Sequence, residues 1–139
     1  MRRPRSQGSV IGGETGAEIV EMALVLPLFL LLIFGIFEFG RAWLAVNTMN
    51  HAAREAVRLA AITTPLGAND TSVVNKAKGI LANTGLTGAS VTNTAPAGTV
   101  TVDIAYNFTF MTGIGPILGF SFAGTIPLTS QAIMRYERY

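Results

Sequence analysis

A nearly unbroken run of apolar residues from Met22 to Phe37 dominates the N-terminal part of the chain. Counted from Ile19 to Phe39, with Glu21 and Glu38 near its ends, the stretch has about the 20 residues needed to cross a hydrocarbon core of roughly 30 Å. The pattern therefore predicts one membrane-spanning helix. Pro27 lies inside it and is expected to bend the span, since membrane helices tolerate proline better than soluble helices do.

The helical pattern continues beyond the apolar run. From Arg41 to Ile62 the chain has no proline or glycine, and apolar residues recur at helical spacing along one stripe. The stripe consists of Trp43, Val46, Met49, Ala53, Val57 and Ala60. We expect one helix from about Ile19 to Ile62, ending at Thr63-Thr64-Pro65 because a residue before proline is pushed out of helical geometry. The stripe is then the natural surface for the rest of the protein to pack on.

Shorter elements of two different periodicities follow. Polar residues open a predicted short helix over residues 69–81, and Gly85 follows it as a stop. Apolar and polar residues alternate from Thr99 to Phe110 and again from Thr125 to Tyr136, which is typical of half-buried strands. The segment from Ala89 to Thr94 is a candidate for one more strand.

The predicted fold class is α+β: a long N-terminal transmembrane α-helix that continues into a small head with one short helix and an antiparallel sheet of two or three strands. Residues 1–16 form a basic cytoplasmic leader, 17–62 the transmembrane and extended helix, and 63–139 a small extracytoplasmic head. Pro127 confines the start of the last strand to a sheet edge or strand end. The apolar connector from Met111 to Gly124 is expected to pack on the head or on a neighbouring molecule.

Composition argues against catalysis and against nucleic-acid binding. The 139 residues carry a net charge of only +2, and arginines in the leader account for it, so no nucleic-acid face is implied. The absence of cysteine excludes disulfides, thiolate metal sites and a cysteine nucleophile. His51 is the single histidine and is expected to be a surface or interface residue rather than a metal ligand. We therefore predict no catalytic residue, metal or cofactor, and no enzyme.

The charges that flank the apolar run predict its orientation. Arginines precede it and fewer positive charges follow it, so the positive-inside bias places residues 1–16 in the cytoplasm and the C-terminus outside, with a single pass. A cleaved secretory signal peptide is the alternative. It would need an apolar core of roughly 7–15 residues and small residues at a cleavage site behind it. Here the helical pattern simply carries on, which disfavours that alternative.

The most informative segment lies where the leader meets the apolar run. Glu21 stands inside the start of the predicted span, where a carboxylate is costly and usually has a partner. The sequence Gly16-Ala17-Glu18-Ile19-Val20-Glu21 resembles a type IV prepilin peptidase site, with a basic leader ending in glycine and a glutamate at the fifth position after the cut. This resemblance implies cleavage between Gly16 and Ala17. It also implies that Glu21 pairs with a new N-terminal amine, its own or a neighbour's, which offsets the desolvation of the carboxylate.

Longer segments narrow the resemblance. They are Glu21-Met22-Ala23-Leu24-Val25-Leu26-Pro27, Phe34-Gly35-Ile36-Phe37-Glu38-Phe39-Gly40-Arg41, Ala52-Ala53-Arg54-Glu55-Ala56-Val57-Arg58 and the ending Ile133-Met134-Arg135-Tyr136-Glu137. Together they resemble the TadE-like family of pseudopilins from tight-adherence (Tad/Flp) pilus systems. The resemblance implies a minor pilin-like subunit of the bacterial inner (cytoplasmic) membrane that takes part in assembling a type IVb adhesive pilus. The implied partners are the prepilin peptidase, other pilin-like subunits, the pilus assembly platform and membrane lipid.

Residues within and just beyond the span suggest contacts with other subunits. Gly35 and Gly40 are small enough for close lateral packing of membrane helices. Glu38 and Arg41 lie three residues apart at the outer end of the span, which suits an interfacial ion pair or a subunit contact.

The processing site leaves two alternatives open. A second register, Gly13-Glu14, would place Glu18 at the fifth position after the cut, but Gly16 is preferred because Glu21 directly abuts the apolar run. Met22 stands after the glutamate where the family often has an aromatic residue, so processing could be less efficient. Without cleavage, both glutamates would be plain interfacial charges.

Other functions are also weighed. The chain could be an unprocessed single-pass anchor whose head binds a ligand or envelope partner through the apolar connector. The contact residues would then be Ile114, Pro116, Leu118 and Phe120. A major pilin is disfavoured because those subunits are usually little more than the N-terminal helix, and an enzyme is the remotest alternative.

Overall fold

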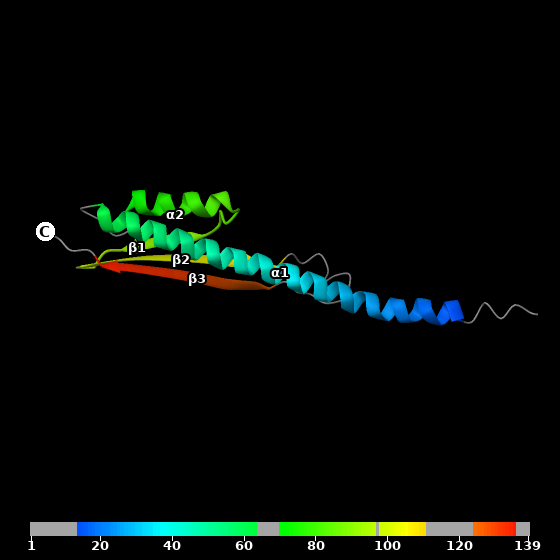
Figure 1. The fold of residues 1–139 in the computed structure, drawn as a ribbon. Helices are drawn as coiled ribbons and strands as arrows, with labels where there is room; N and C mark the ends of the chain where they lie inside the picture. The colour runs from blue at the N-terminus through cyan, green and yellow to red at the C-terminus, as the bar shows by residue number, and fades with distance from the viewer. Residues whose placement is uncertain (1–13, 64–69, 97, 111–123, 136–139) are drawn as a thin grey trace, which may run out of the picture. The chain divides into compact units, whose positions relative to one another are not determined.

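The computed structural model describes residues 14–63, 70–96, 98–110 and 124–135. Along the chain these form the helices α1 (Glu14–Ile62) and α2 (Thr71–Asn83) and the strands β1 (Ser90–Thr94), β2 (Thr99–Thr109) and β3 (Thr125–Arg135), shown in Figure 1. The predicted α+β fold with one long and one short helix and an antiparallel sheet is confirmed. The apolar connector, with Ile114, Pro116, Leu118 and Phe120, lies outside the described residues.

Helix α1 begins earlier than the apolar pattern predicts. The expected start was about Ile19, whereas the helix begins at Glu14. The segment before Ile19 includes glutamates, which are good helix formers and are favoured near the positive end of a helix dipole. The end agrees with the prediction: the last helical residue is Ile62, and Thr63 bonds back to the Leu59 carbonyl oxygen through its hydroxyl at 2.9 Å.

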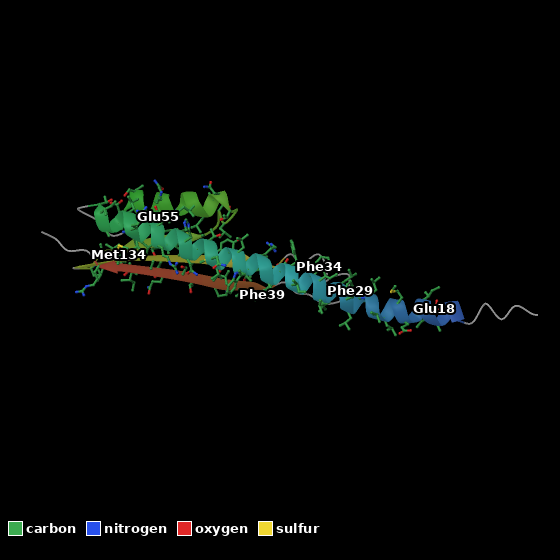
Figure 2. All side chains as sticks on the ribbon, in the orientation of Figure 1. Glu18, Phe29, Phe34, Phe39, Glu55 and Met134 are labelled. Atoms are coloured by element: carbon green, nitrogen blue, oxygen red, sulfur yellow. The ribbon has the colours of Figure 1, made fainter. Side chains whose placement is uncertain are left out.

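The chain divides into two compact units, residues 1–37 and 38–139, and α1 contributes to both. In the first unit the described side chains of α1 are exposed with the exception of the half-buried Pro27, and Phe29 and Phe34 point away from the helix axis in Figure 2. This helix is long and apolar enough to cross a membrane, and its apolar stretch is not buried by the rest of the protein. Such a surface needs lipid or other apolar partners, because exposing it to water is unfavourable.

The second unit is built on a three-stranded antiparallel sheet in the order β1-β2-β3. Central strand β2 pairs with β1 in the register Val91↔Ile104 and with β3 in the register Val102↔Ala132. Pro127 therefore lies on an edge strand, as predicted. An edge strand can accommodate a proline because the missing backbone N–H can be on the side that has no neighbouring strand. The segment foreseen as a candidate third strand is β1.

One face of this sheet forms the core together with α2 and the part of α1 beyond Phe37. Alternate residues of β1 and β2 join buried residues of both helices in a single cluster, and Figure 1 shows both helices on the same side of the sheet. The strand residues of this cluster are Val91, Val100, Val102, Ile104 and Phe108, and the helix residues are Ala45, Met49, Ala52, Ala53, Ala56, Val57, Ala60, Val73, Ala77 and Leu81. The predicted pairing of the helix with the sheet is thus confirmed. Most of the buried residues that α1 contributes to this cluster are alanines, so its buried face consists mainly of small side chains.

The predicted apolar stripe of α1 was wrong at its first position. Trp43 is 63% exposed, and Val46 is only half-buried. The buried face instead begins at Ala45 and includes both Ala52 and Ala53. A spacing of three or four residues fits either of two neighbouring lines on a helix, so the sequence pattern alone did not select the buried one.

The short helix α2 begins at polar residues and is followed by Gly85, as the sequence suggested. Asp70 is the N-cap and accepts a hydrogen bond from the Ser72 backbone N–H at 2.8 Å. Thr84 is the C-cap, and Gly85 follows with φ of 80°, a left-handed conformation that glycine adopts without steric penalty. The chain therefore turns from α2 towards β1 at the predicted stop.

Candidate functional site

The candidate cleavage junction lies in the first turns of α1. Gly16 and Ala17 are both helical and exposed, and a Cβ added at Gly16 would meet nothing within 4 Å. Packing within this chain therefore gives no reason for a glycine there. A glycine in a helix is about 1 kcal/mol less favourable than alanine, so Gly16 weakens the helix locally at the predicted cleavage bond.

Glu21 lies four residues after Ala17 on the same helix, and its side chain is exposed. Residues four apart are neighbours on one face of a helix, about 6 Å apart along its axis. An amine created at Ala17 would thus lie one turn below this carboxylate, or below that of an adjacent subunit. Glu18, which is also exposed, points about 100° away from Ala17 around the helix.

The two candidate packing glycines lie on different sides of α1. A Cβ added at Gly35 or at Gly40 would meet nothing within 4 Å, so neither glycine is required by the packing of this chain. Being five residues apart, they are separated by about 140° around the helix axis. One partner helix can therefore approach only one of them, and the role of either in a helix–helix contact stays a prediction.

Glu38 and Arg41 form the ion pair that the sequence suggested. One guanidinium nitrogen of Arg41 lies 2.9 and 2.8 Å from the two carboxylate oxygens of Glu38. The Glu38 side chain is only 15% exposed and that of Arg41 37%. The guanidinium carbon of Arg41 also lies 5.2 Å from the centre of the Phe108 ring, a cation–π distance. This contact with β2 could not be foreseen from spacing along the helix.

Sequence reasoning missed an aromatic pair on the outer side of α1. The rings of Phe39 and Trp43 stack with their centroids 6.2 Å apart, and the two residues are 69% and 63% exposed. The signal available in the sequence is the spacing of four residues between two aromatic side chains at the end of an apolar run. The helical spacing of apolar residues instead predicts Trp43 on the stripe that faces the core.

Charged groups farther along α1 make local contacts. Arg58 pairs with Glu55 at 2.7 Å, and Lys76 of α2 lies 3.8 Å from the same carboxylate. The hydrogen bond from Arg58 lowers the pKa of Glu55 and in turn raises the pKa of Arg58. His51 is exposed, and among the described residues no group of acidic, histidine or cysteine side chains is arranged to hold a metal ion.

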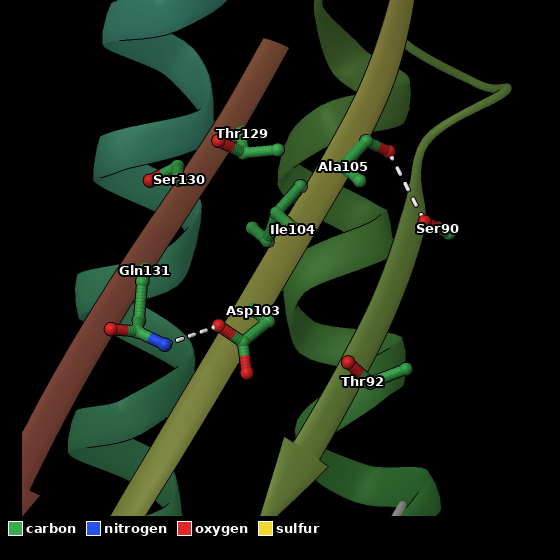
Figure 3. A pocket seen from close by; sticks show the side chains of 8 residues that line it. All are labelled: Ser90, Thr92, Asp103, Ile104, Ala105, Thr129, Ser130 and Gln131. Atoms are coloured by element: carbon green, nitrogen blue, oxygen red, sulfur yellow. Dashed lines mark hydrogen bonds between the residues drawn. The ribbon is translucent and has the colours of Figure 1, made fainter. Parts of the chain in front are cut away.

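The sheet face turned away from the helices carries a shallow polar depression, drawn in Figure 3. Its floor includes the cross-strand neighbours Asp103 and Gln131, joined by a 2.6 Å hydrogen bond from the glutamine amide to the carboxylate. The Ser90 hydroxyl donates to the Ala105 carbonyl oxygen at 3.3 Å. These groups satisfy one another, and their arrangement offers no nucleophile with a nearby base.

The geometry defines a class of protein: an α+β head and, among the described residues, one exposed apolar helix that is long enough to serve as a membrane anchor. A comparison of the chain with models of known protein families finds a match in the region of this helix. The model of the family described as TadE-like protein matches residues 16–58. The resemblance drawn from the sequence is confirmed over this segment, about a third of the chain. The match supports a pilin-like protein associated with the Tad pilus. Comparisons with curated proteins and with solved structures give no match.

Proposed function

We propose that this chain is a minor pilin or pseudopilin that prepilin peptidase cleaves between Gly16 and Ala17 and that takes part in assembling a Tad/Flp type IVb adhesive pilus. One observation carries the proposal. The TadE-like match begins at Gly16, the residue that ends the predicted leader, and the helix that follows exposes its apolar side chains. The family match therefore begins at the proposed cut.

The same observation favours one cleavage register. The alternative cut after Gly13 would leave residues before Gly16 on the mature chain, outside the family match. With the cut after Gly16, Glu21 lies one helical turn from the new amine and close to the first apolar residues. Pairing of the two charges would offset the penalty of placing a carboxylate at the edge of the hydrocarbon core.

The proposed location is the bacterial inner membrane, with the leader in the cytoplasm and the second unit outside. Its support is the placement of Arg2, Arg3 and Arg5 before the apolar run, according to the positive-inside rule. Prepilin peptidase, other pilin-like subunits, the assembly platform and lipid are the partners proposed on the strength of the family match.

Intact mass and N-terminal peptide mapping of the membrane-extracted protein test the cleavage. We expect a mature chain that starts at Ala17 in cells with prepilin peptidase and the full-length chain in cells without it. Substitution Gly16→Val should abolish shortening, whereas the matched substitution Gly13→Val should leave it unchanged. Full-length protein in both strains would refute processing, and the reverse result for the two variants would establish the other register.

The pairing role of Glu21 is tested separately. Glu21→Ala should leave membrane insertion intact and reduce piliation, because the new amine loses its counter-charge. Glu18→Ala is the matched control, an equally exposed glutamate three residues earlier on α1. Normal piliation with Glu21→Ala would remove the pairing argument while leaving cleavage untouched.

The alternative is an unprocessed single-pass anchor whose head binds a ligand or envelope partner. The contact predicted for this function, the apolar connector with Ile114, Pro116, Leu118 and Phe120, lies outside the described residues. This function predicts a full-length membrane form and no pilus defect on deletion, so the mass measurement separates the two.

A further inference from the structure

We propose that the outer edge of β3 accepts a fourth strand, an amphipathic segment of another polypeptide that is apolar towards the helices and polar on its other face. The sheet of the second unit is thereby extended from three strands to four. The proposal goes beyond the proposed function, since it requires only the fold of the second unit and neither cleavage nor entry into a pilus.

The two edges of this sheet differ in length and in protection. Among the described residues, β2 has a neighbour on both sides, whereas β1 and β3 each have a neighbour on one side only. β1 has five residues and β3 has 11, so β3 presents the longer row of backbone groups. Edge strands are usually kept from pairing by shortness, by charged side chains or by proline. In β3 the proline and the one charge, Pro127 and Arg135, lie near the ends, so the stretch from Leu128 to Met134 lacks these devices.

The free backbone groups of β3 can be assigned from its pairing with β2. In an antiparallel sheet each residue directs its N–H and its C=O to the same side, and successive residues alternate. The Ala105 carbonyl oxygen accepts a hydrogen bond from the Ser90 hydroxyl of β1, as Figure 3 shows, so Ala105 is oriented towards β1. Its partner Thr129 therefore directs its N–H and C=O away from β2. The same orientation holds for every second residue of β3, including Pro127, Gln131 and Ile133.

The chemistry of this edge matches a polypeptide backbone. A row of free N–H and C=O groups along a strand is complementary to the same row on another extended chain, and this is how strand addition to a sheet edge gains its affinity. Apolar side chains accompany the row: Ile126, Ile133 and Met134 are 46%, 61% and 36% exposed. An added strand would cover part of each, so apolar burial would contribute to binding together with the backbone hydrogen bonds.

Helix α1 offers a further apolar contact beside this edge. The Ser130 hydroxyl donates a 2.7 Å hydrogen bond to the amide oxygen of Asn50, which identifies the side of α1 that lies over β3. Trp43 stands seven residues before Asn50, about two helical turns, and is therefore on the same side of the helix. Its side chain is 63% exposed. Side chains of an added strand that point towards the helices would meet apolar surface on α1 as well as on β3.

Strand β2 shows which side-chain pattern suits β3, because it already pairs with the other edge. On the face towards the helices Val100 lies opposite Met134, and on the other face the Gln131 amide donates a 2.6 Å hydrogen bond to Asp103. A strand with the same alternation on the free edge would meet the same β3 side chains from the opposite side. This is why the occupant is an amphipathic strand, apolar towards the helices and polar on its other face.

A synthetic strand tests the proposal on the full-length protein in phospholipid nanodiscs. The probe is a peptide with the sequence of residues 99–109, acetylated and amidated at its ends. In the register of β2, its residues 101, 103 and 105 would direct their backbone groups towards β3, and 102 and 104 would direct theirs away. The probe therefore carries N-methyl groups at Val102 and Ile104, which leave the binding edge free. The matched control carries them at Asp103 and Ala105, which blocks it.

Residue-resolved amide hydrogen exchange is the measurement. We expect the probe to slow exchange at Thr129, Gln131 and Ile133, about tenfold when its concentration is about ten times Kd. Ser130 and Ala132, whose N–H groups face β2, should be unaffected, and the control peptide should change nothing. No protection by either peptide at millimolar concentration, or equal protection by both, would overturn the proposal. Protection that appears without peptide and grows with protein concentration would assign the edge to a second copy of this chain and overturn it too.

A variant of β3 examines the same contact from the side of the protein. Thr129→Pro removes a central free N–H but no hydrogen bond to β2, because Pro127 already has this backbone orientation. We expect it to weaken probe binding about tenfold, whereas Thr129→Ala, which keeps the N–H, should bind as the native protein does. Unchanged affinity in a proline variant whose remaining sheet amides stay protected would contradict the proposal. If that variant does not fold, the comparison of the two peptides decides alone.

Discussion

The substitution Met49→Ala tests whether the part of α1 beyond Phe37 is an integral part of the head. Met49 is fully buried between the helix and the sheet. If the head were an independent unit hung on a helical stalk, truncating a stalk residue would leave its stability unchanged. Because Met49 belongs to the same core as Val102 and Leu81, we expect the whole head to be destabilised.

The magnitude follows from the three side-chain atoms that are lost. Removing three groups from a fully buried site forfeits about 2.4 kcal/mol of transfer free energy, at roughly 0.8 kcal/mol per methylene-sized group. The unfilled space adds about 24 cal/mol per Å³ of cavity that does not collapse, or about 1 kcal/mol for 40 Å³. The expected loss in the free energy of unfolding is therefore about 3 kcal/mol, a change of roughly 150-fold in the ratio of folded to unfolded heads.

Pulse proteolysis of the full-length protein in membranes measures this loss. A short protease exposure after equilibration in increasing urea cleaves only the unfolded head, and the midpoint and slope give the free energy of unfolding. Met22→Ala is a matched control, the same substitution at a methionine that is 64% exposed on the first unit. It should change head stability by less than about 0.5 kcal/mol.

A loss below about 0.5 kcal/mol for Met49→Ala would refute the packing of α1 against the sheet, since no relaxation of a buried site removes the transfer contribution. Equal losses for the two methionine variants would show that the assay reports membrane insertion rather than head unfolding.

Three further substitutions probe single features of the head with the same assay. Gly85→Ala should lower stability by about 1 kcal/mol, because φ of 80° strains any residue with a Cβ, whereas Gly88→Ala, with equal space around it, should be nearly neutral. Asp70→Ala should destabilise α2 at neutral pH. Hydrogen bonds from the Ser72 hydroxyl and backbone N–H hold the pKa of Asp70 below its ordinary value, so the advantage of the native protein over the variant should persist above about pH 4 and shrink as the pH falls towards the lowered pKa. Ser130→Ala removes the donor of a 2.7 Å hydrogen bond to an amide oxygen of α1 and should cost about 1 kcal/mol, and no measurable loss would show that water replaces this bond.

The strands were predictable because their alternation is strict. Along β2 the side chains of Val100, Val102 and Ile104 are buried and those between them are more exposed, so a period of two assigns both the element and its face. The boundaries followed from local chemistry as well. Proline stops α1 and a carboxylate caps α2, and both signals act within a few residues.

The face of α1 that packs on the sheet was harder to predict. Trp43 and Ala45 are both apolar, but only Ala45 is buried by the head, whereas Trp43 is exposed. Hydrophobic periodicity does not distinguish an apolar side chain that faces the sheet from one that stays exposed, and so the large side chain of Trp43 was assigned to the core.

The candidate site depends even less on local pattern. The Glu38–Arg41 pair could be predicted from its spacing, but the packing of Arg41 on Phe108 joins residues far apart in the chain, and no periodicity encodes it. The cleavage junction could be predicted only from the family resemblance. An exposed glycine and an exposed glutamate on a helix do not by themselves specify a peptidase site.

With the cleavage proposed above, the exposed apolar surface of the first unit limits what the mature protein can do. Each large apolar side chain transferred from lipid to water is unfavourable by about 1.5–3 kcal/mol, so a helix covered with them cannot leave the bilayer alone. A subunit that enters a fibre must exchange lipid for the helices of its neighbours in one step, and Glu21 must keep a counter-charge during that exchange. Packing glycines such as Gly35, which this chain does not itself use, would let those neighbours approach closely enough to replace the lipid. A subunit confined to the base of the pilus needs neither condition, and so bulky substitutions at Gly35 should block incorporation into a fibre without affecting residence in the membrane.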